Sequence, residues 1–222
     1  MMSWFYWFSV AFMKMVMCLF TRWTVNGKKN VPLSGPLIVV ANHIDRADPP
    51  LVAASLPRPV IFMAKVELFQ TPVSRWVVKN FGAIPVRREI PDREALEKAR
   101  DLLGSSAAIG IFPEGTRSVS AQLSQGMSGA ALLAFHSGAP ILPIGISGTE
   151  RLRNMSFLFR RPRVLVNIGK PFTVGQSLNN KNNRKERLKE ATDTIMLHIA
   201  ELLPPSYQGA YGRKENAGNQ KV

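Results

Sequence analysis

Short apolar runs alternate with amphipathic segments along most of this chain, and this alternation restricts the fold more than any other feature. Residues 37–41 read LIVVA, a continuous apolar run that is typical of a strand buried on both faces of a sheet. Further strand patterns lie at residues 59–64, 83–87, 107–112, 141–146 and 163–168. Helical patterns lie at residues 49–56, 72–80, 92–103, 128–137 and 183–203. Strands alternating with helices predict a single α/β domain whose mostly parallel mixed sheet is flanked by helices.

The N-terminal segment is hydrophobic and carries Lys14 as its single charge, in the sequence MMSWFYWFSVAFMKMVMCLF. It lacks the basic start and the small-residue cleavage site of a signal peptide. A run of this length can span a bilayer, but a helix would place Ser3, Lys14 and Thr21 on one stripe and leave aromatic residues on the remaining surface. We therefore expect residues 1–22 to form a helix that lies in one leaflet, with a single span or a buried core helix as the alternatives.

Charge and cysteine content narrow the class of protein. The formal net charge is +14, which attracts nucleic acid, an acidic lipid surface or phosphorylated substrates without choosing among them. The basic residues directly after the N-terminal segment indicate the cytoplasmic face of the cell membrane. The single cysteine, Cys18, excludes an intramolecular disulfide and a cysteine-based metal site.

We expect one domain over residues 23–203 and a disordered polar tail over residues 204–222.

Polar residues cluster directly after two predicted strands, where the ligand sites of open α/β sheets collect. The first cluster, behind the strand at 37–41, contains His43 and Asp48. Histidine can accept a proton near neutral pH, but a useful base needs a partner that fixes its tautomer. Asp48 can be this partner if His43 lies in the loop and Asp48 is the N-cap of the next helix, which would begin at Pro49. The alternative is an ordinary loop histidine beside an ordinary capping aspartate.

The second cluster follows the strand at 107–112 and reads FPEGTRS over residues 112–118. It combines a carboxylate, a flexible backbone position, a hydroxyl and a guanidinium, on Glu114, Gly115, Thr116 and Arg117. Arg117 can hold a phosphate through two parallel N–H bonds, and Gly115 lets the chain approach a ligand closely. The alternative is a surface turn with a solvated charge pair.

Together, the motifs NHIDRADP at residues 42–49 and FPEGTRS at residues 112–118 resemble the paired signature of the glycerolipid acyltransferase family. The small bacterial 1-acyl-sn-glycerol-3-phosphate (lysophosphatidic acid) acyltransferases are the members that it resembles most. Residues 82–87 match the family's middle motif, a glycine followed by an arginine at the end of a strand, and residues 140–143 match its proline-bracketed fourth motif. The resemblance covers residues 23–172 in the family's order and spacing, so it implies that residues 23–203 form an acyltransferase domain.

The resemblance implies a general-base mechanism at the first cluster. His43, oriented by Asp48, would deprotonate the sn-2 hydroxyl of lysophosphatidic acid. The oxygen would then attack a fatty acyl thioester of coenzyme A or acyl carrier protein and give phosphatidic acid. No metal, no other cofactor and no covalent acyl-enzyme is implied.

The resemblance also implies which residues bind the substrates. Lys65, Arg87 and Arg117 would hold the acceptor phosphate, and Glu114 would either bind acceptor hydroxyls or fix the Arg117 loop. The implied substrate-binding residues are Lys65, Arg87, Glu114, Gly115, Thr116 and Arg117. The expected partners are a lysophospholipid, an acyl thioester, an anionic membrane surface and acyl carrier protein as one possible donor, without nucleic acid.

One residue departs from the family pattern. Many relatives carry a lysine where this chain has Met127, within the sequence GMSG. This keeps glycerol-3-phosphate, dihydroxyacetone phosphate and a lyso-aminolipid open as alternative acceptors. A basic nucleic-acid-binding protein and a non-catalytic membrane adaptor are the alternatives from other classes. The aromatic residues gather in the N-terminal segment and no nucleic-acid motif occurs, which speaks against the first of these.

The run RLRNMSFLFRRPR at residues 151–163 mixes five arginines with Met155, Phe157, Leu158 and Phe159. Basic residues strengthen contact with an anionic lipid surface. This run predicts a second membrane contact, with a solvated loop over the core as the alternative.

Overall fold

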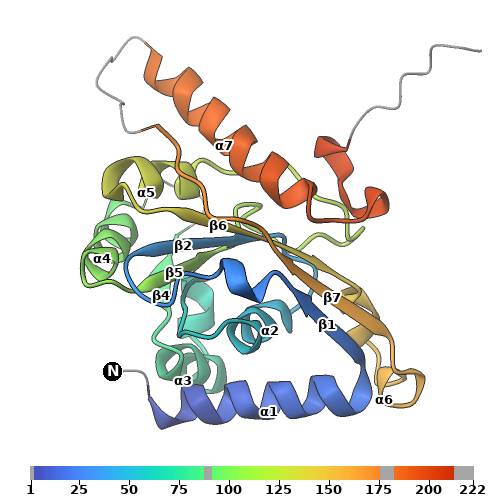
Figure 1. Cartoon of the computed structure of the whole chain (residues 1–222). Coiled ribbons are helices and arrows are strands. Elements are labelled where there is room, and N and C mark those ends of the chain that lie inside the picture. The colour runs from blue at the N-terminus through green and yellow to red at the C-terminus, as the bar shows by residue number, and fades with distance from the viewer. Residues whose placement is uncertain (1–2, 88–91, 176–182, 213–222) are drawn as a thin grey trace, which may run out of the picture.

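The computed structural model describes residues 3–87, 92–175 and 183–212. Its strands form one seven-stranded sheet in the order β1-β7-β6-β2-β5-β3-β4 (Figure 1). The strands are β1 (Arg22–Asn26), β2 (Leu37–Ala41), β3 (Ile61–Lys65), β4 (Ile84–Val86), β5 (Ala108–Ile111), β6 (Ile141–Ser147) and β7 (Arg163–Ile168). Neighbouring strands run parallel, except that β6 and β7 are antiparallel. The predicted α/β domain with a mostly parallel sheet is confirmed.

Helices cover both faces of this sheet. They are α1 (Trp4–Phe20), α2 (Asp48–Ser55), α3 (Pro72–Asn80), α4 (Arg93–Gly104), α5 (Gly129–Ser137), α6 (Phe157–Arg160) and α7 (Arg184–Ala200). Single 3-10 turns cover Lys28–Asn30, Val66–Phe69, Thr149–Leu152, Pro205–Tyr207 and Gly209–Tyr211. Figure 1 shows α4, α5 and α7 on one face of the sheet and α1, α2 and α3 on the other. The parallel topology explains this arrangement, since each crossover must pass over one face.

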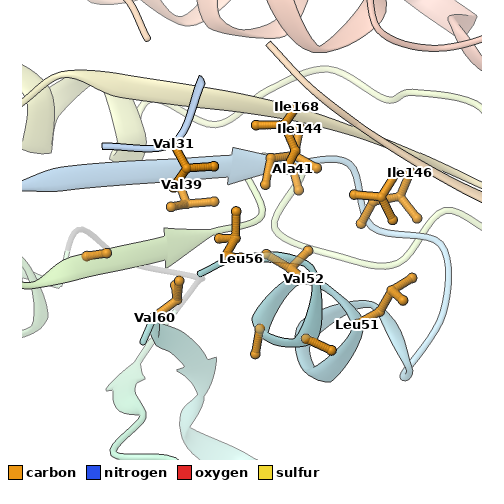
Figure 2. Packing of buried hydrophobic residues seen from close by; sticks show 14 of the residues in the cluster. Val31, Val39, Ala41, Leu51, Val52, Leu56, Val60, Ile144, Ile146 and Ile168 are labelled. Carbon is orange, nitrogen blue, oxygen red and sulfur yellow. The ribbon is translucent and has the colours of Figure 1, made fainter. Parts of the chain in front are cut away.

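Strand β2 shows how the sequence pattern produces two cores. Leu37, Val39 and Ala41 pack in the cluster on the α1 and α2 side, part of which Figure 2 shows. Ile38 and Val40 point the other way, into the cluster on the α4, α5 and α7 side. Because successive side chains of a strand alternate between faces, a strand buried on both faces must be apolar throughout. The ends of β2 are therefore the places where polar chemistry can begin.

Helix α1 is docked mainly against α2, with fewer contacts to β1 and α6. Tyr6, Val10 and Met17 are buried on its inner face. The buried backbone N–H of Val60 donates a hydrogen bond to the Tyr6 hydroxyl at 3.1 Å. Ser3 caps the helix by accepting a hydrogen bond from the backbone N–H of Tyr6. The N-terminal helix is thus part of the folded domain.

The outer face of α1 is apolar and open to solvent. Its large exposed side chains are Trp4, Trp7, Phe8, Phe12, Met15 and Leu19. No helix among the described residues has both the length and the hydropathy needed to cross a bilayer. Contact of this face with a membrane stays a prediction.

The C-terminal segment differs from the predicted disordered tail over residues 204–212. Its 3-10 turns pack against the loop that follows the second polar cluster: Leu123 N donates to Tyr207 O at 2.8 Å, and Ala210 N donates to Leu123 O at 3.2 Å. Composition predicts disorder here because the sequence is short and polar, but two tyrosines give it partners in the domain. Residues 213–222, the rest of the predicted tail, lie outside the described residues.

The docking of α1 can be tested through Tyr6. Tyr6→Phe leaves the buried N–H of Val60 without its acceptor. An unsatisfied buried donor costs about 1–3 kcal/mol, so we expect urea unfolding to show a loss of this size in the free energy of unfolding. Cys18→Ser, at an exposed position of the same helix, is the matched control and should change stability little. Equal stability of the two variants would contradict the docking of α1.

Candidate active site

The loop after β2 is fixed to the next strand in the sheet by the buried Asn42. Its side-chain amide donates to Ile146 O at 2.9 Å and accepts from Ile146 N at 2.7 Å. Asn42 thus replaces a strand residue in the ladder to β6 and turns the chain out of the sheet. This positions His43 at the C-terminal edge of the parallel strands, where sequence reasoning expects a site.

Asp48 holds the loop that carries His43. The carboxylate is fully buried, and its Oδ2 accepts hydrogen bonds from His43 Nδ1 at 2.9 Å, Ile44 N at 2.6 Å and Asp45 N at 2.7 Å. Helix α2 begins at Asp48 with Ala47 as its N-cap and no side-chain cap. The prediction that Asp48 is the N-cap is therefore wrong. Its Oδ2 is used by the preceding loop, whereas its Oδ1 is buried without a hydrogen-bond partner among the described residues, so neither oxygen caps the first turn of the helix.

The imidazole of His43 is oriented by two neighbours. Asp48 accepts the bond at Nδ1, so in the neutral ring the proton lies on Nδ1 and the lone pair lies on Nε2. The ring stacks on Phe112, with 4.2 Å between the centroids and 24° between the planes. The side chain is 12% exposed, so the ring remains accessible from outside. Phe112 is a contact that sequence reasoning missed, because a stacking partner leaves no pattern in the sequence.

Glu114 joins the two polar clusters from inside. It is buried; Oε1 accepts a hydrogen bond from His43 N at 2.8 Å, and Oε2 accepts one from Ser124 N at 2.9 Å. Nearby, Ser118 N donates to His43 O at 2.8 Å. Burial raises the pKa of Glu114, and the hydrogen bonds from the His43 and Ser124 backbones lower it only in part. Of the two predicted roles for Glu114, this geometry favours fixing the loop.

Arg153 is a second connection between these loops that sequence reasoning missed. Its Nη2 donates to Ile44 O at 2.9 Å and to Ser118 O at 3.3 Å. Its Nε lies 3.6 Å from Asp45 Oδ2. The sequence places Arg153 in the basic run predicted to contact a membrane, but its guanidinium turns inward to two carbonyl oxygens. Nothing in the sequence pattern distinguishes it from its arginine neighbours.

A cavity of about 360 Å³ lies on the other side of the second polar cluster, and neither His43 nor Asp48 is among its lining residues. Phe112 connects the cavity with His43, because its ring stacks on the imidazole and also lines the cavity. The other apolar lining residues are Met63, Val86, Leu96, Ile111, Pro113, Met127, Ala130 and Leu132. Gly115 lines the cavity with φ of +68°, and the sulfur of Met127 occupies the space that a side chain at Gly115 would need. The cavity is suited to an apolar chain with few polar groups.

The predicted phosphate-binding residues are only partly brought together. Arg87, directly after β4, lines the cavity, as does Gly115. Lys65 is not among the lining residues, and its Nζ forms an ion pair with Glu67 at 2.9 Å. Thr116 and Arg117 are exposed on their loop and do not line the cavity either. The structure therefore places one arginine at the cavity and one on the neighbouring surface loop.

A family model described as acyltransferase matches residues 22–147, more than half of the chain. The chain belongs to the acyltransferase family. The match includes both polar clusters, so the family predicted from the two motifs is confirmed.

Individual members of the acyltransferase family show how far the similarity extends. A 1-acyl-sn-glycerol-3-phosphate acyltransferase of Bacillus subtilis is 29% identical over 202 residues, which are 89% of this chain and 96% of the relative. A chloroplast enzyme of Brassica napus with the same activity in its name is 31% identical over 136 residues, 60% of this chain and 39% of the relative. The chain spans 39% of the length of the Brassica relative and 50% of the length of a chloroplast relative from Arabidopsis thaliana.

A solved member of the acyltransferase family has a similar structure. The crystal structure of a 1-acyl-sn-glycerophosphate acyltransferase from Thermotoga maritima matches with a TM-score of 0.64 and 27% identity. The match covers 86% of this chain and 79% of the Thermotoga chain. The similarity thus includes most of the described domain.

The buried carboxylate of Glu114 gives a pH-dependent prediction. Since burial raises the pKa of Glu114 in the folded state, its contribution to stability is fully present below the pKa of the unfolded chain. This contribution is lost as pH rises through the higher folded pKa. We expect the stability of Glu114→Gln to increase relative to the natural protein over this pH range, measured by urea unfolding. Glu97→Gln, at an exposed position on α4, is the control, and a difference that does not change with pH would contradict the prediction.

Proposed function

We propose that this chain transfers a fatty acyl group from a thioester of coenzyme A or acyl carrier protein to the sn-2 hydroxyl of 1-acyl-sn-glycerol-3-phosphate. The product is phosphatidic acid. The observation that carries the proposal is the 2.9 Å hydrogen bond between His43 Nδ1 and the fully buried Asp48. This bond leaves Nε2 as the proton acceptor on a ring that stays accessible. A general base needs this combination of fixed tautomer and open nitrogen.

The reaction follows from these two residues. His43 Nε2 takes the proton of the acceptor hydroxyl while the oxygen forms a bond with the thioester carbonyl carbon. Asp48 stabilises the imidazolium that results. The tetrahedral intermediate then breaks its carbon–sulfur bond, and the leaving thiolate takes the proton back from Nε2 of His43. The ester and the thiol are the products, and the enzyme returns to its starting state without a covalent intermediate.

The cavity and the basic residues provide binding sites for the acyl chain and for the acceptor phosphate. The apolar lining of the cavity suits an acyl chain. Arg87 lies at this cavity, and Arg117 lies on the exposed loop after Glu114. We propose that these two arginines hold the acceptor phosphate, joined by Lys65 if it leaves Glu67. The Bacillus and Thermotoga relatives are named for acyl transfer to this kind of acceptor, which supports the proposal.

We also propose that the outer face of α1 attaches the enzyme to the cytoplasmic face of the cell membrane. A lysophospholipid resides in the membrane, so a membrane-bound enzyme meets it directly. The exposed tryptophans of α1, Trp4 and Trp7, suit the headgroup region of a bilayer. A face with six large exposed apolar side chains is unusual for a protein surface that stays in water.

The activity can be tested with a panel of acceptors. The purified protein is incubated with one labelled acyl thioester and a mixture of lysophosphatidic acid, glycerol-3-phosphate, dihydroxyacetone phosphate and lyso-aminolipids. We expect labelled phosphatidic acid, identified by its mass. His43→Ala should lower the rate by about 100-fold or more, because a positioned general base contributes about 10²–10⁴ to a rate.

The control for this experiment is His136→Ala, which removes an exposed histidine on α5. Circular dichroism establishes that both variants fold. Retained turnover in folded His43→Ala would refute the general-base role. A product from another acceptor would refute lysophosphatidic acid as the substrate, and no product with any acceptor would favour a non-catalytic adaptor.

The membrane attachment of α1 gives a separate prediction. Phe8 and Phe12 stack on each other and are 57% and 52% exposed. Phe8→Ser combined with Phe12→Ser should weaken binding to phospholipid vesicles at least about tenfold, because a buried phenylalanine side chain contributes roughly 1.5–3 kcal/mol. The control is Leu197→Ser, at a half-exposed position of α7 on the opposite face of the sheet. Flotation with vesicles is the measurement, and unchanged binding of the double variant would contradict attachment through α1.

A further inference from the structure

Helix α6 and the turn before it carry two highly exposed large apolar side chains. Phe159 is 89% exposed and Met155 is 72% exposed. They lie on the short connection between β6 and β7, which projects from the sheet near the C-terminal end of α1 (Figure 1). Neither side chain belongs to the two hydrophobic clusters of the domain. Their exposure is therefore not needed for the packing of the core.

Direct contacts join α6 to α1. The rings of Phe157 and Phe20 meet edge to face, with 6.5 Å between their centroids. Arg161 Nη2 donates to Cys18 O at 3.3 Å. The segment that carries the exposed Met155 and Phe159 is thus attached to the C-terminal end of α1.

Four arginines surround this end of α1. Arg22 and Arg163 are paired in register on the neighbouring strands β1 and β7, and Arg160 and Arg161 end α6. None of these four arginines forms an ion pair with a carboxylate of the described residues. Like charges placed opposite each other on paired strands repel, so the four arginines favour an anionic partner.

We propose that this surface binds the headgroups of anionic phospholipids and forms a second membrane contact beside α1. We call it the α6 patch; its residues are Arg22, Met155, Phe159, Arg160, Arg161 and Arg163. Met155 and Phe159 enter the lipid at the boundary between headgroups and acyl chains, and the arginines bind the lipid phosphates. Arg153 is excluded from the patch, since its guanidinium binds the catalytic loops.

The α6 patch would fix the orientation of the domain on the membrane. A single helix in the membrane surface leaves the domain free to roll about the helix axis. A second contact beside the C-terminal end of α1 removes this freedom and sets which edge of the sheet faces the lipid. The inference rests on the proposed attachment of α1, but it adds a dependence on lipid charge that the apolar face of α1 does not by itself require.

The test uses the full chain and two kinds of vesicle, pure phosphatidylcholine and phosphatidylcholine mixed with phosphatidylglycerol. Arg160→Ala should weaken binding to the anionic vesicles about five-fold and leave binding to the neutral vesicles unchanged. Phe159→Ser should weaken binding to both kinds, by about tenfold. Vesicle binding is measured without turnover, so these results do not depend on whether the protein catalyses acyl transfer.

The matched controls are two residues near the N-terminal end of β2, whereas the α6 patch follows the C-terminal end of the parallel neighbour β6. Leu33 is 74% exposed and Lys29 is exposed, and both precede the N-terminal end of β2. Leu33→Ser and Lys29→Ala should therefore bind both vesicles as the natural protein does. Equal binding of the patch variants and these controls would overturn the proposal. So would variants that keep vesicle binding but lose binding to acyl carrier protein, since the patch would then be a protein docking site.

Discussion

The geometry of the candidate site depends on one oxygen atom, Oδ2 of Asp48. Three donors converge on it, and two of them are backbone N–H groups that fix the shape of the loop before α2. A buried carboxylate costs several kcal/mol unless it is compensated, so the loop and the carboxylate stabilise each other. The next turn of α2, with Leu51 and Val52, is fully buried in the core. The proposed base is therefore oriented by a residue whose own position is set by the packing of the domain.

The two polar clusters come together through contacts between residues about 70 positions apart in the chain. Glu114 and Ser118 bind the backbone of His43 from opposite directions, and Arg153 binds carbonyls of both loops. Parallel strand order makes this possible, because β2 and β5 are neighbours and end at the same edge. Glu114 and Arg153 thus bind backbone atoms here, and in the proposed mechanism the substrates are left to the imidazole, the apolar cavity, Arg87 and Arg117.

The sequence predicts well those elements whose local pattern and tertiary packing agree. The LIVVA run is β2 in full, and α3 (Pro72–Asn80) has the bounds predicted for it. Prediction from the sequence fails where one side chain has two alternative hydrogen-bond partners. Asp48 has the position of a helix cap, but the loop competes for its oxygen, and Arg153 sits in a basic run but turns inward. Such choices depend on distances across the fold, which residue order does not contain.

The apolar residues on the two sides of α1 differ in their burial. Three side chains on the inner face are buried and dock the helix on α2, whereas six large ones on the outer face remain exposed. A helix recruited only to the core would have the opposite ratio, because each exposed aromatic side chain loses the roughly 1.5–3 kcal/mol that burial provides. Docking therefore accounts for the position of α1 but not for its composition. The proposed lipid surface accounts for the composition, since it buries the outer face without changing the fold.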